Sequence, residues 1–463
     1  MPGDASVGRF PTRTVAIGPM AIGGGRPRLL QSMVNVSPGE KDRFLRAVDR
    51  LLAVDCRLIR LALANRRDLS NFLSLLRFLP RDGVAYVADL HFGSELALAA
   101  LDVCEKVRIN PGNFGIFRTR PWREYDNASF AKERELVAGQ ARTFFQKAAK
   151  MNRAVRIGCN GGSIAGRMRW RHGDSALLAS MEEMVAWARE VGMENLVISL
   201  KASDCRRTVE WNRMAVRRMA EFGWDYPLHL GVTEAGCGVA GLVRGAIGIG
   251  TLVSAGMGDT LRLSLAEAPE REVEFCRTLL AFLDRYPFPP VEFGKKSVAI
   301  VDGCADLCID PCASDRDMAL LGIVHRILSA PQLRTVAIGR GRCEEWRREV
   351  VEWTLQCCGW GNFRTEIIAC PTCGRTTYDV AAAADAVRVR LGNLPNVRIA
   401  VMGCVVNGVG EMGDADYGYI GCGKGRVNLY RKGICLLRSV PEKNAIDVLE
   451  EWIYSDGKVC GRL

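Results

Sequence analysis

The chain has 463 residues, 48% of them hydrophobic and 25% charged, a composition typical of a globular protein with two or three domains. The formal net charge of +11, from 63 basic and 52 acidic residues, favours encounter with anions but does not choose among a nucleotide, a small phosphate and an acidic protein. No stretch of about eighteen apolar residues is free of charge, which excludes a membrane-spanning helix.

The cysteine content indicates a reducing compartment. The chain contains 18 cysteines, and its first residues, MPGDASVGRFPTRT, lack the apolar core of a secretory signal. In such a context cysteines are typically reduced thiols or ligands of a metal or cluster, rather than a disulfide framework. We therefore expect a cytoplasmic protein without a membrane partner.

Eight short apolar runs follow one another in the first 265 residues. They are LLQSM, LIRLAL, VAYVAD, KVRIN, AVRIGC, LVISLK, LHLGVT and LRLSL, at 29–33, 58–63, 84–89, 106–110, 154–159, 196–201, 228–233 and 261–265. Runs rich in Val, Ile and Leu, separated by segments long enough for helices, are typical of parallel strands covered on both faces. We predict an α/β fold, a (β/α)8 TIM barrel over residues 12–285. A doubly wound open sheet is the alternative.

Polar residues gather where these predicted strands end. They are Arg60, Asp89, His91, Arg108, Asn110, Asn113, Arg156, Asn160, Lys201, His229, Thr233, Glu234, Arg262 and Ser264. Barrel enzymes place their sites at the carboxyl ends of the strands, so five cations would share one mouth. Such a cluster needs an anion, and arginine suits phosphate oxygens, which predicts a ligand with more than one phosphoryl group. The alternative is that each cation pairs with a neighbouring carboxylate, for which Asp89 and Glu234 are the clear candidates.

Residues 286–360 have the pattern of a small β-α-β-α insert. We expect strands at 297–303 and 333–339 and helices at 318–328 and 344–356. Cys304, Cys308 and Cys312 are spaced by four residues, but Pro311 disrupts a single helical face. We interpret these three as structural or incidental thiols.

Residues 361–463 are predicted to form a small α+β domain. It would contain strands at 365–369 and 397–402 and helices at 378–391 and 441–454. The glycine-rich run at 418–425 resembles a phosphate loop but lacks the lysine-serine ending and the following helix, so we predict a turn there.

Two motifs in this domain indicate a metal centre. ACPTCGR contains Cys370 and Cys373, and MGCVVNGVGE contains Cys404 and Glu411. Three thiolates at two adjacent strand ends suit an iron-sulfur cluster, whose fourth iron can take a weak ligand such as Glu411, whereas structural zinc normally takes four protein ligands. The alternative is that these are buried apolar thiols. Further candidates for the fourth ligand are Cys422, Cys435 and Cys460.

The motifs together resemble those of the 4-hydroxy-3-methylbut-2-enyl diphosphate synthase family, iron-sulfur enzymes of the non-mevalonate isoprenoid (MEP) pathway. The matching segments, in order, are QSM (31–33), VADLHF (87–92), VRINPGN (107–113), VRIGCNGGS (155–163), LKASD (200–204), PLHLGVTEAG (227–236), GMGDTLRLSL (256–265), ACPTCGR and GCVVNGVGE. The resemblance implies a TIM barrel followed by a 4Fe-4S domain. It also implies reductive opening and dehydroxylation of 2-C-methyl-D-erythritol 2,4-cyclodiphosphate, with electrons from ferredoxin or flavodoxin.

The resemblance assigns roles residue by residue. Cys370, Cys373 and Cys404 would bind three irons, and Glu411 the fourth until substrate replaces it. Arg60, Arg108, Arg156, Lys201, Arg262 and Ser264 would hold the diphosphate, with Asn110, Asn160 and Thr233 beside it. Asp89, His91, His229 and Glu234 would be placed for proton transfer, Glu234 being the preferred acid/base group.

The chain departs from the family pattern at several points. Val409 stands where the family motif usually has proline, and Val34 and Val36 replace threonines. The insert is absent from the short form of the family, in which the cluster domain of one subunit closes the barrel of its partner in a head-to-tail dimer. Two other functions remain open from the residues alone. They are a redox-inactive 4Fe-4S hydro-lyase acting on a phosphorylated substrate, and a phosphate-binding or nucleic-acid-binding protein with structural zinc.

Overall fold

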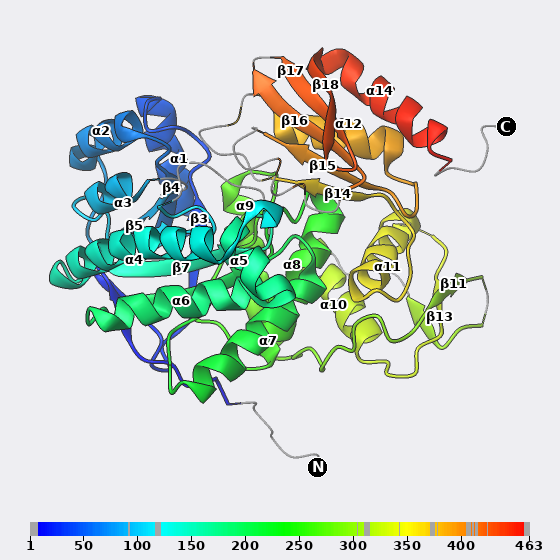
Figure 1. The fold of residues 1–463 in the computed structure, drawn as a ribbon. Coiled ribbons are helices and arrows are strands. Elements are labelled where there is room, and N and C mark those ends of the chain that lie inside the picture. Colours follow the sequence, from blue (N-terminus) through cyan, green and yellow to red (C-terminus); the bar gives the residue numbers. More distant parts are fainter. Residues whose placement is uncertain are drawn as a thin grey trace. The chain divides into compact units, whose positions relative to one another are not determined.

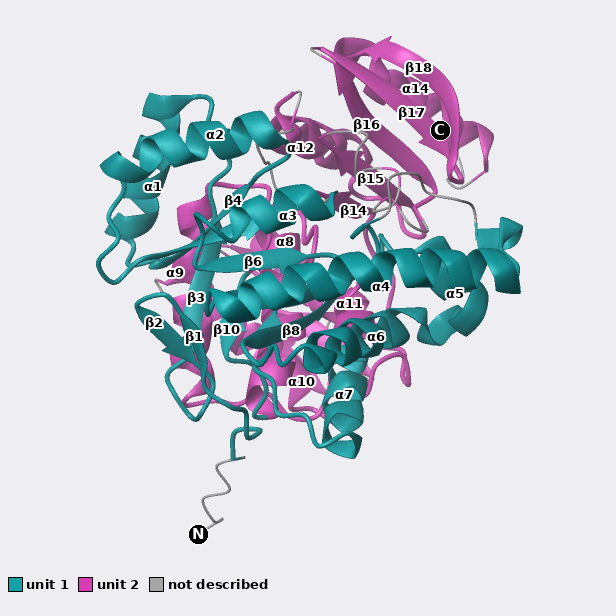
Figure 2. Cartoon of the chain, turned by 60° about the vertical axis from the view of Figure 1, so that its left-hand side comes forward, with its two compact units in different colours: residues 1–202, 210–230, 256–262 teal, residues 203–209, 231–255, 263–463 magenta. Residues whose placement is uncertain are grey.

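The computed structural model describes residues 8–90, 93–115, 122–302, 304–309, 315–341, 343–370, 376, 378–403, 409, 412, 415–423 and 425–457. The chain forms two compact units, which Figures 1 and 2 show. Unit 1 consists of Met1–Ala202, Glu210–Leu230 and Gly256–Arg262, and unit 2 of Ser203–Val209, Gly231–Ala255 and Leu263–Leu463.

Unit 1 contains an eight-stranded parallel sheet. Its strands are β3 (Leu29–Met33), β4 (Leu58–Ala62), β5 (Ala85–Asp89), β6 (Lys106–Ile109), β7 (Ala154–Asn160), β8 (Leu196–Lys201), β9 (His229–Leu230) and β10 (Thr260–Leu261). The order is β8-β7-β6-β5-β4-β3-β10-β9. A parallel bridge between Ile198 and Leu228 joins the two ends, and Ile198 N donates to Pro227 O at 2.9 Å. The sheet therefore closes on itself, which confirms the TIM barrel over the open sheet.

Helices connect the strands of unit 1. They are α1 (Lys41–Ala53), α2 (Arg66–Leu75), α3 (Ser94–Ala100), α4 (Asn127–Lys150), α5 (Gly166–His172) and α6 (Ala176–Glu190), with α7 (Cys205–Glu221) beginning in unit 2 and continuing into unit 1. Three short 3₁₀ turns lie at Leu76–Phe78, Trp122–Glu124 and Gly173–Ser175. The start of α4 is fixed by a capping box in which Asp126 and Ser129 satisfy each other's backbone N–H groups. The longest of the described helices therefore begins at a residue that the local sequence specifies.

The amino end of the barrel is apolar. A hairpin of β1 (Val15–Ile17) and β2 (Met20–Ile22) packs on the strand starts. Together they bury a cluster of Val15, Ile17, Ile22, Leu58, Ala85, Val87, Ala154 and Val197. Side chains two residues apart lie on the same face of a strand. Two residues after Leu58, Val87 and Ala154, toward the carboxyl ends, the inward positions are charged, with Arg60, Asp89 and Arg156. The core therefore changes from apolar to cationic along the barrel axis.

Unit 2 contains two long helices and a small parallel sheet. The helices α8 (Gly238–Ser254) and α9 (Pro269–Leu283) precede β11 (Ala299–Val301), β12 (Leu307–Ile309), α10 (Arg316–Leu328), β13 (Thr335–Ile338) and α11 (Glu344–Cys358). The sheet order is β11-β13-β12. The sequence-based β-α-β-α pattern missed β12, because three residues are too few to show a periodicity. Cys304 and Cys308 of this segment are exposed, and Cys312 lies outside the described residues.

The carboxyl-terminal part of unit 2 is a five-stranded sheet. Its order is β14 (Glu366–Ala369), β15 (Arg398–Met402), β16 (Tyr417–Gly423), β17 (Arg426–Arg431) and β18 (Ile434–Pro441), with helices α12 (Val380–Leu391) and α14 (Glu442–Ser455). The predicted turn at 418–425 is wrong, since most of it is β16. Tyr417 and Tyr419 are buried, and a Cβ at Gly418 would lie only 2.4 Å from Met412 Sδ. Glycine is thus used in this strand for close packing.

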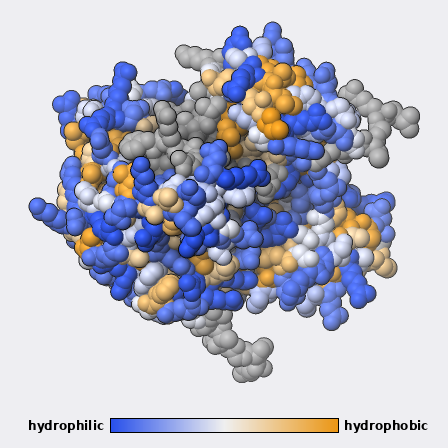
Figure 3. Space-filling model, viewed as in Figure 1, coloured by the Kyte–Doolittle hydropathy of each residue, from blue (hydrophilic) through white to orange (hydrophobic). Residues whose placement is uncertain are grey.

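The surface is mostly hydrophilic on the face that Figure 3 shows, and one of its apolar patches lies over strands β17 and β18. The large exposed apolar residues of β18 are Ile434, Leu436 and Leu437. Among the described residues, no helix is both long and apolar enough to span a bilayer.

Candidate active site

Five cations meet at the carboxyl-terminal half of the barrel, all within unit 1. Arg60 lies on β4, Arg108 on β6, Arg156 on β7 and Lys201 at the end of β8, and Arg262 directly follows β10. Their exposed fractions are at most 6% for Arg108, Arg156, Lys201 and Arg262. Burial of this much like charge is costly without a counter-charge, so its neutralisation is the central question of the site.

Asp89 is the carboxylate that the described part of unit 1 supplies to this cluster. Its Oδ2 lies 2.7 Å from Arg60 Nη2 and its Oδ1 lies 3.2 Å from Arg108 Nη1. Arg108 Nη2 also donates to Gly158 O at 2.7 Å. A Cβ at residue 158 would lie 2.6 Å from Arg108 Nε, so the glycine allows the guanidinium to lie across β7. Asp89 therefore orients two arginines but offsets only part of the positive charge.

Several donor atoms of the cluster have no acceptor among the described residues. They are Nε of Arg60 and Arg108, and Nε and Nη1 of Arg156. Burial is the largest cause that lowers the pKa of Arg60 to about 10, and it also moves the pKa of Arg156 well below the usual range. Buried donors normally find partners, so these four atoms indicate a place for an anionic ligand.

His229 is buried between a cation and a hydroxyl group. Its Nε2 lies 3.2 Å from Lys201 Nζ, and its Nδ1 lies 2.8 Å from Thr260 Oγ1. Burial, followed by the charge of Lys201, lowers the pKa of His229 well below its ordinary value. The imidazole is therefore neutral at physiological pH, with one ring nitrogen facing Lys201 and the other facing Thr260.

Asn110 links its own loop to the loop after β7, and Asn160 forms a hydrogen bond within its own loop. Asn110 Nδ2 donates to Ser163 Oγ at 2.7 Å, and Asn110 Oδ1 accepts from Gly112 N at 3.1 Å. Asn160 Oδ1 accepts from Gly162 N at 3.0 Å. Both amides therefore shape the loops at the strand ends. In the same half of the barrel, Arg262 Nη1 lies 3.7 Å from Met33 Sδ.

In unit 2, the segment containing Glu234 lies beside the strand that precedes Cys370. Ala235 forms a parallel bridge with Ala369 at the end of β14. Glu234 is 4% exposed and has a φ of +49°, a left-handed conformation that is uncommon for a non-glycine residue. Strain of this kind often occurs at functional positions. Thr233 Oγ1 is buried without a hydrogen-bond partner among the described residues, and Ser264 is 3% exposed.

Arg244 on α8 fixes this arrangement, although the sequence did not identify it. Its Nη1 donates to Ala235 O and to Ile367 O, both at 2.9 Å, and its guanidinium lies 4.9 Å from the centroid of the Trp353 ring. A single buried side chain thus ties the segment after Glu234 to β14. Only the contact between residues distant in sequence reveals this role.

Cys370 follows β14, and its surroundings suit a thiolate ligand. Gly403 N donates to Cys370 Sγ at 3.1 Å, which places the residue before Cys404 next to the first thiol of the ACPTCGR motif. Backbone N–H bonds to sulfur are among the factors that tune iron-sulfur clusters. Cys373, Cys404 and Glu411 lie outside the described residues, as does His91. Val409, the residue that replaces the family proline, is 44% exposed.

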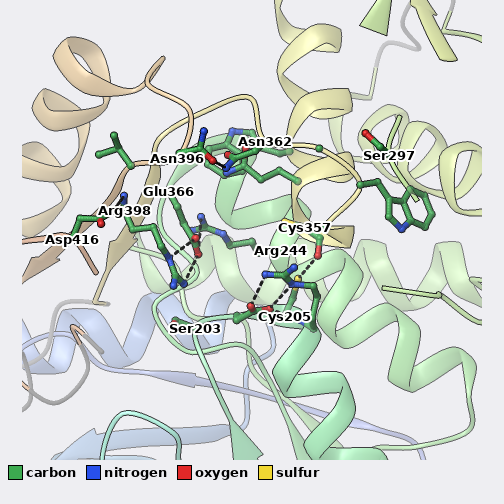
Figure 4. Close-up of a pocket in the computed structure, with 18 of the residues that line it drawn as sticks. Ser203, Cys205, Arg244, Ser297, Cys357, Asn362, Glu366, Asn396, Arg398 and Asp416 are labelled. Carbon is green, nitrogen blue, oxygen red and sulfur yellow. Dashed lines mark hydrogen bonds and ion pairs between the residues drawn. The ribbon is translucent and has the colours of Figure 1, made fainter. Parts of the chain in front are cut away.

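Unit 2 also has a cavity of about 660 Å³, which Figure 4 shows. Its charged lining residues are largely paired with each other, unlike the cations of the barrel. Arg206 Nη2 donates to Asp204 Oδ2 at 2.9 Å, and Arg398 Nε lies 2.8 Å from Glu366 Oε2. The cavity is therefore close to neutral and offers less attraction for an anion than the barrel does.

Sequence reasoning also missed Lys106 and Gln31, two buried polar residues inside the barrel. Lys106 is 0% and Gln31 is 2% exposed, and their side-chain polar atoms have no hydrogen-bond partner among the described residues. Lys106 precedes Arg108 by two residues, so the alternation of a strand would have placed both on the same face.

Comparisons with known proteins agree with this site. The model of the GcpE TIM-barrel domain matches residues 12–277, and that of the GcpE protein C-terminal domain matches residues 366–455. The ferredoxin-type 4-hydroxy-3-methylbut-2-en-1-yl diphosphate synthase of Prochlorococcus marinus subsp. pastoris is 33% identical, covering 96% of this chain and 93% of its own. The flavodoxin-type enzyme of Porphyromonas gingivalis is 30% identical, covering 97% of this chain and 98% of its own.

Among solved structures, dihydropteroate synthase from Thermus thermophilus covers 59% of this chain and 100% of its own, with 15% identity and a TM-score of 0.37, a likeness too weak to bear on function. The two family models cover the barrel strands, the five cations and the strands around Cys370. With identities of 33% and 30% over nearly the whole length of two curated enzymes, the chain belongs to the GcpE family.

Proposed function

We propose that the protein is a 4-hydroxy-3-methylbut-2-en-1-yl diphosphate synthase that reductively opens and dehydroxylates 2-C-methyl-D-erythritol 2,4-cyclodiphosphate. The observation that carries this proposal is the cluster of five cations, four of them buried and the fifth nearly so, for which the described residues supply one carboxylate and leave four donor atoms without a partner. A cyclic diphosphate would supply the missing negative charge. The names of the curated relatives support the same activity.

The barrel residues would bind and orient the diphosphate. Arg60 and Arg108, held by Asp89, present their guanidinium groups in fixed directions, and Arg156 contributes two donor atoms that have no partner in the described part of the chain. Lys201, whose Nζ lies beside His229, would donate a hydrogen bond to the same diphosphate. Because these groups are desolvated before the ligand arrives, their attraction for phosphoryl oxygens is stronger than it would be at a surface.

Glu234 is the acid/base group that we favour for proton transfer. It is buried, its backbone is left-handed, and the next residue bridges to the end of β14. Thr233 Oγ1, which has no hydrogen-bond partner in the described part of the chain, is available to a substrate hydroxyl group. His229 is less suited to donate a proton, because it is neutral and both its ring nitrogens are engaged.

The residues of unit 2 fit an iron-sulfur cluster. Cys370 and the Gly403 N–H bond to its sulfur place two neighbouring strand ends together, and Cys373, Cys404 and Glu411 would complete the ligands. When bound, a 4Fe-4S cluster would pass the two electrons of the reduction one at a time from the donor and would offer a Lewis-acidic iron. Ferredoxin or flavodoxin would be the electron donor, as in the two groups of relatives.

Anaerobic purification, iron and sulfide analysis, and turnover with and without a reductant test the function. We expect about four irons per chain and product only with reductant. Product without reductant would indicate a hydro-lyase, and bound zinc without sulfide would indicate a structural site. Arg108→Ala and Arg262→Ala should weaken substrate binding by roughly 2–5 kcal/mol with the cluster absorbance unchanged. Unchanged affinity in both variants would contradict the barrel site.

Glu411→Cys tests whether the fourth ligand is exchangeable. A thiolate should bind iron more tightly than a carboxylate, so the variant should hold a stable cluster but turn over far more slowly. Substrate should also no longer perturb the electron paramagnetic resonance signal of the reduced variant. Parental turnover with a normal spectral response would remove Glu411 from the mechanism.

A further inference from the structure

Lys106 is a fully buried lysine without a counter-charge in its surroundings. It is 0% exposed, and Nζ has no hydrogen-bond partner among the described residues. The charged groups that act on it are Arg156 and Arg60, both cations, and together with burial they lower the pKa of Lys106 well below its ordinary value. An amine in this position lowers the stability of the folded protein unless a ligand compensates for it.

The strand register places Lys106 in the row of Arg60, one row before Arg108 and Arg156. Arg60 pairs with Val87 and Val87 pairs with Lys106, so the three residues form one row across β4, β5 and β6. Arg108 and Arg156 form the next row toward the carboxyl ends. Two residues along a strand correspond to about 6.6 Å, which is close to the reach of an extended lysine side chain.

The two strand neighbours of Lys106 in this row are apolar. Val87 and Ala154, the neighbours of Lys106 on β5 and β7, belong to the apolar cluster at the amino end of the barrel. Lys106 therefore lies between two apolar neighbours, and the cations that act on it are Arg60 in its own row and Arg156 in the next row. No acidic side chain is among the groups that act on it.

We propose that Lys106 forms the floor of the anion site beside Arg60, where its amine binds an oxygen of the phosphoryl group that Arg108 and Arg156 hold from the next row. This inference rests on the proposed function for the identity of the substrate, but the chemistry it needs is that of any diphosphate. A ligand bound in this way would reach one row deeper than Arg108 and Arg156.

The test compares Lys106→Met with a matched control, Lys132→Met, on the exposed face of α4. Methionine keeps the length of the side chain and removes its donors. The full chain, purified anaerobically with its cluster, is titrated with inorganic pyrophosphate and with the cyclodiphosphate, and thermal unfolding is measured without ligand. We expect Lys106→Met to have a Tm at or above that of the parent but to bind both ligands at least tenfold more weakly. Lys132→Met should match the parent in all three measurements.

A structural role predicts a different pattern, namely a lower Tm and unchanged dissociation constants. Parental affinity for both ligands in Lys106→Met would overturn the proposal. If that variant does not fold, Lys106→Gln is used, and affinity within twofold of the parent would likewise overturn it. If the parent binds pyrophosphate but not cyclodiphosphate, and Lys106→Met weakens pyrophosphate binding, the floor site stands and the proposed substrate is wrong.

Discussion

Replacing Asp89 by asparagine should destabilise the protein strongly in the absence of an anion. Asp89 is 2% exposed in its side chain and contacts Arg60 at 2.7 Å and Arg108 at 3.2 Å, whose side chains are 11% and 8% exposed. The substitution keeps the shape of the side chain but leaves two enclosed guanidinium groups without a charge partner. Further repulsion comes from the neighbouring cations. Arg262 repels Arg60, and it also repels Arg156.

The expected loss follows from these contacts. Removing one partner of a buried ion pair costs about 3–5 kcal/mol, a large share of the roughly 5–15 kcal/mol that stabilises a typical folded domain. At about 2–4 °C per kcal/mol for a domain of this size, the Tm should fall by roughly 6–20 °C. Pyrophosphate at a hundred times its dissociation constant should restore about 2.7 kcal/mol.

Thermal unfolding of the anaerobic protein, with and without pyrophosphate, measures both effects. The matched control is Asp102→Asn, because Asp102 pairs with Lys147 at 2.8 Å on the surface, where the two side chains are 53% and 33% exposed. That exposed pair should contribute less than about 1 kcal/mol. If Asp89→Asn loses no more stability than Asp102→Asn, or if pyrophosphate does not restore it, the picture of an anion-dependent cation cluster is wrong.

Two further predictions concern Arg244 and His229. Arg244→Met removes two charge-assisted hydrogen bonds to buried carbonyls, each contributing about 1.5–3 kcal/mol, and should lower kcat with the iron content unchanged. Arg206→Met, in the wall of the neighbouring cavity, is the control, and equal kcat values for the two variants would contradict the positioning role. The depressed pKa of His229 means that the unfolded chain binds the extra proton below about pH 6.5, so stability should fall with acidification by up to about 1.36 kcal/mol per pH unit. Urea unfolding between pH 5 and 7.5 should show a shallower slope for His229→Gln, and parallel slopes would refute this.

The sequence determined the barrel and the position of its cations. Six of the eight apolar runs agree closely with the observed strands, for example 106–110 against Lys106–Ile109 for β6, whereas the runs 228–233 and 261–265 only partly overlap β9 (His229–Leu230) and β10 (Thr260–Leu261). This succeeded because burial on both faces of a parallel strand imposes a local composition that can be read from a few residues. The five cations could be placed together because the carboxyl ends of parallel strands in one barrel always face the same way.

The tertiary structure decided the partners of those residues. The alternation within 106–110 allows Lys106 to face inward, but its isolation depends on the register of β5, β6 and β7, which brings Val87 and Ala154 beside it. The bridge between Ala235 and Ala369 likewise joins two segments, and nothing in the sequence of either segment indicates that they are in contact. Composition and periodicity act over a few residues, whereas register, burial and the pairing of charges depend on contacts between distant parts of the chain.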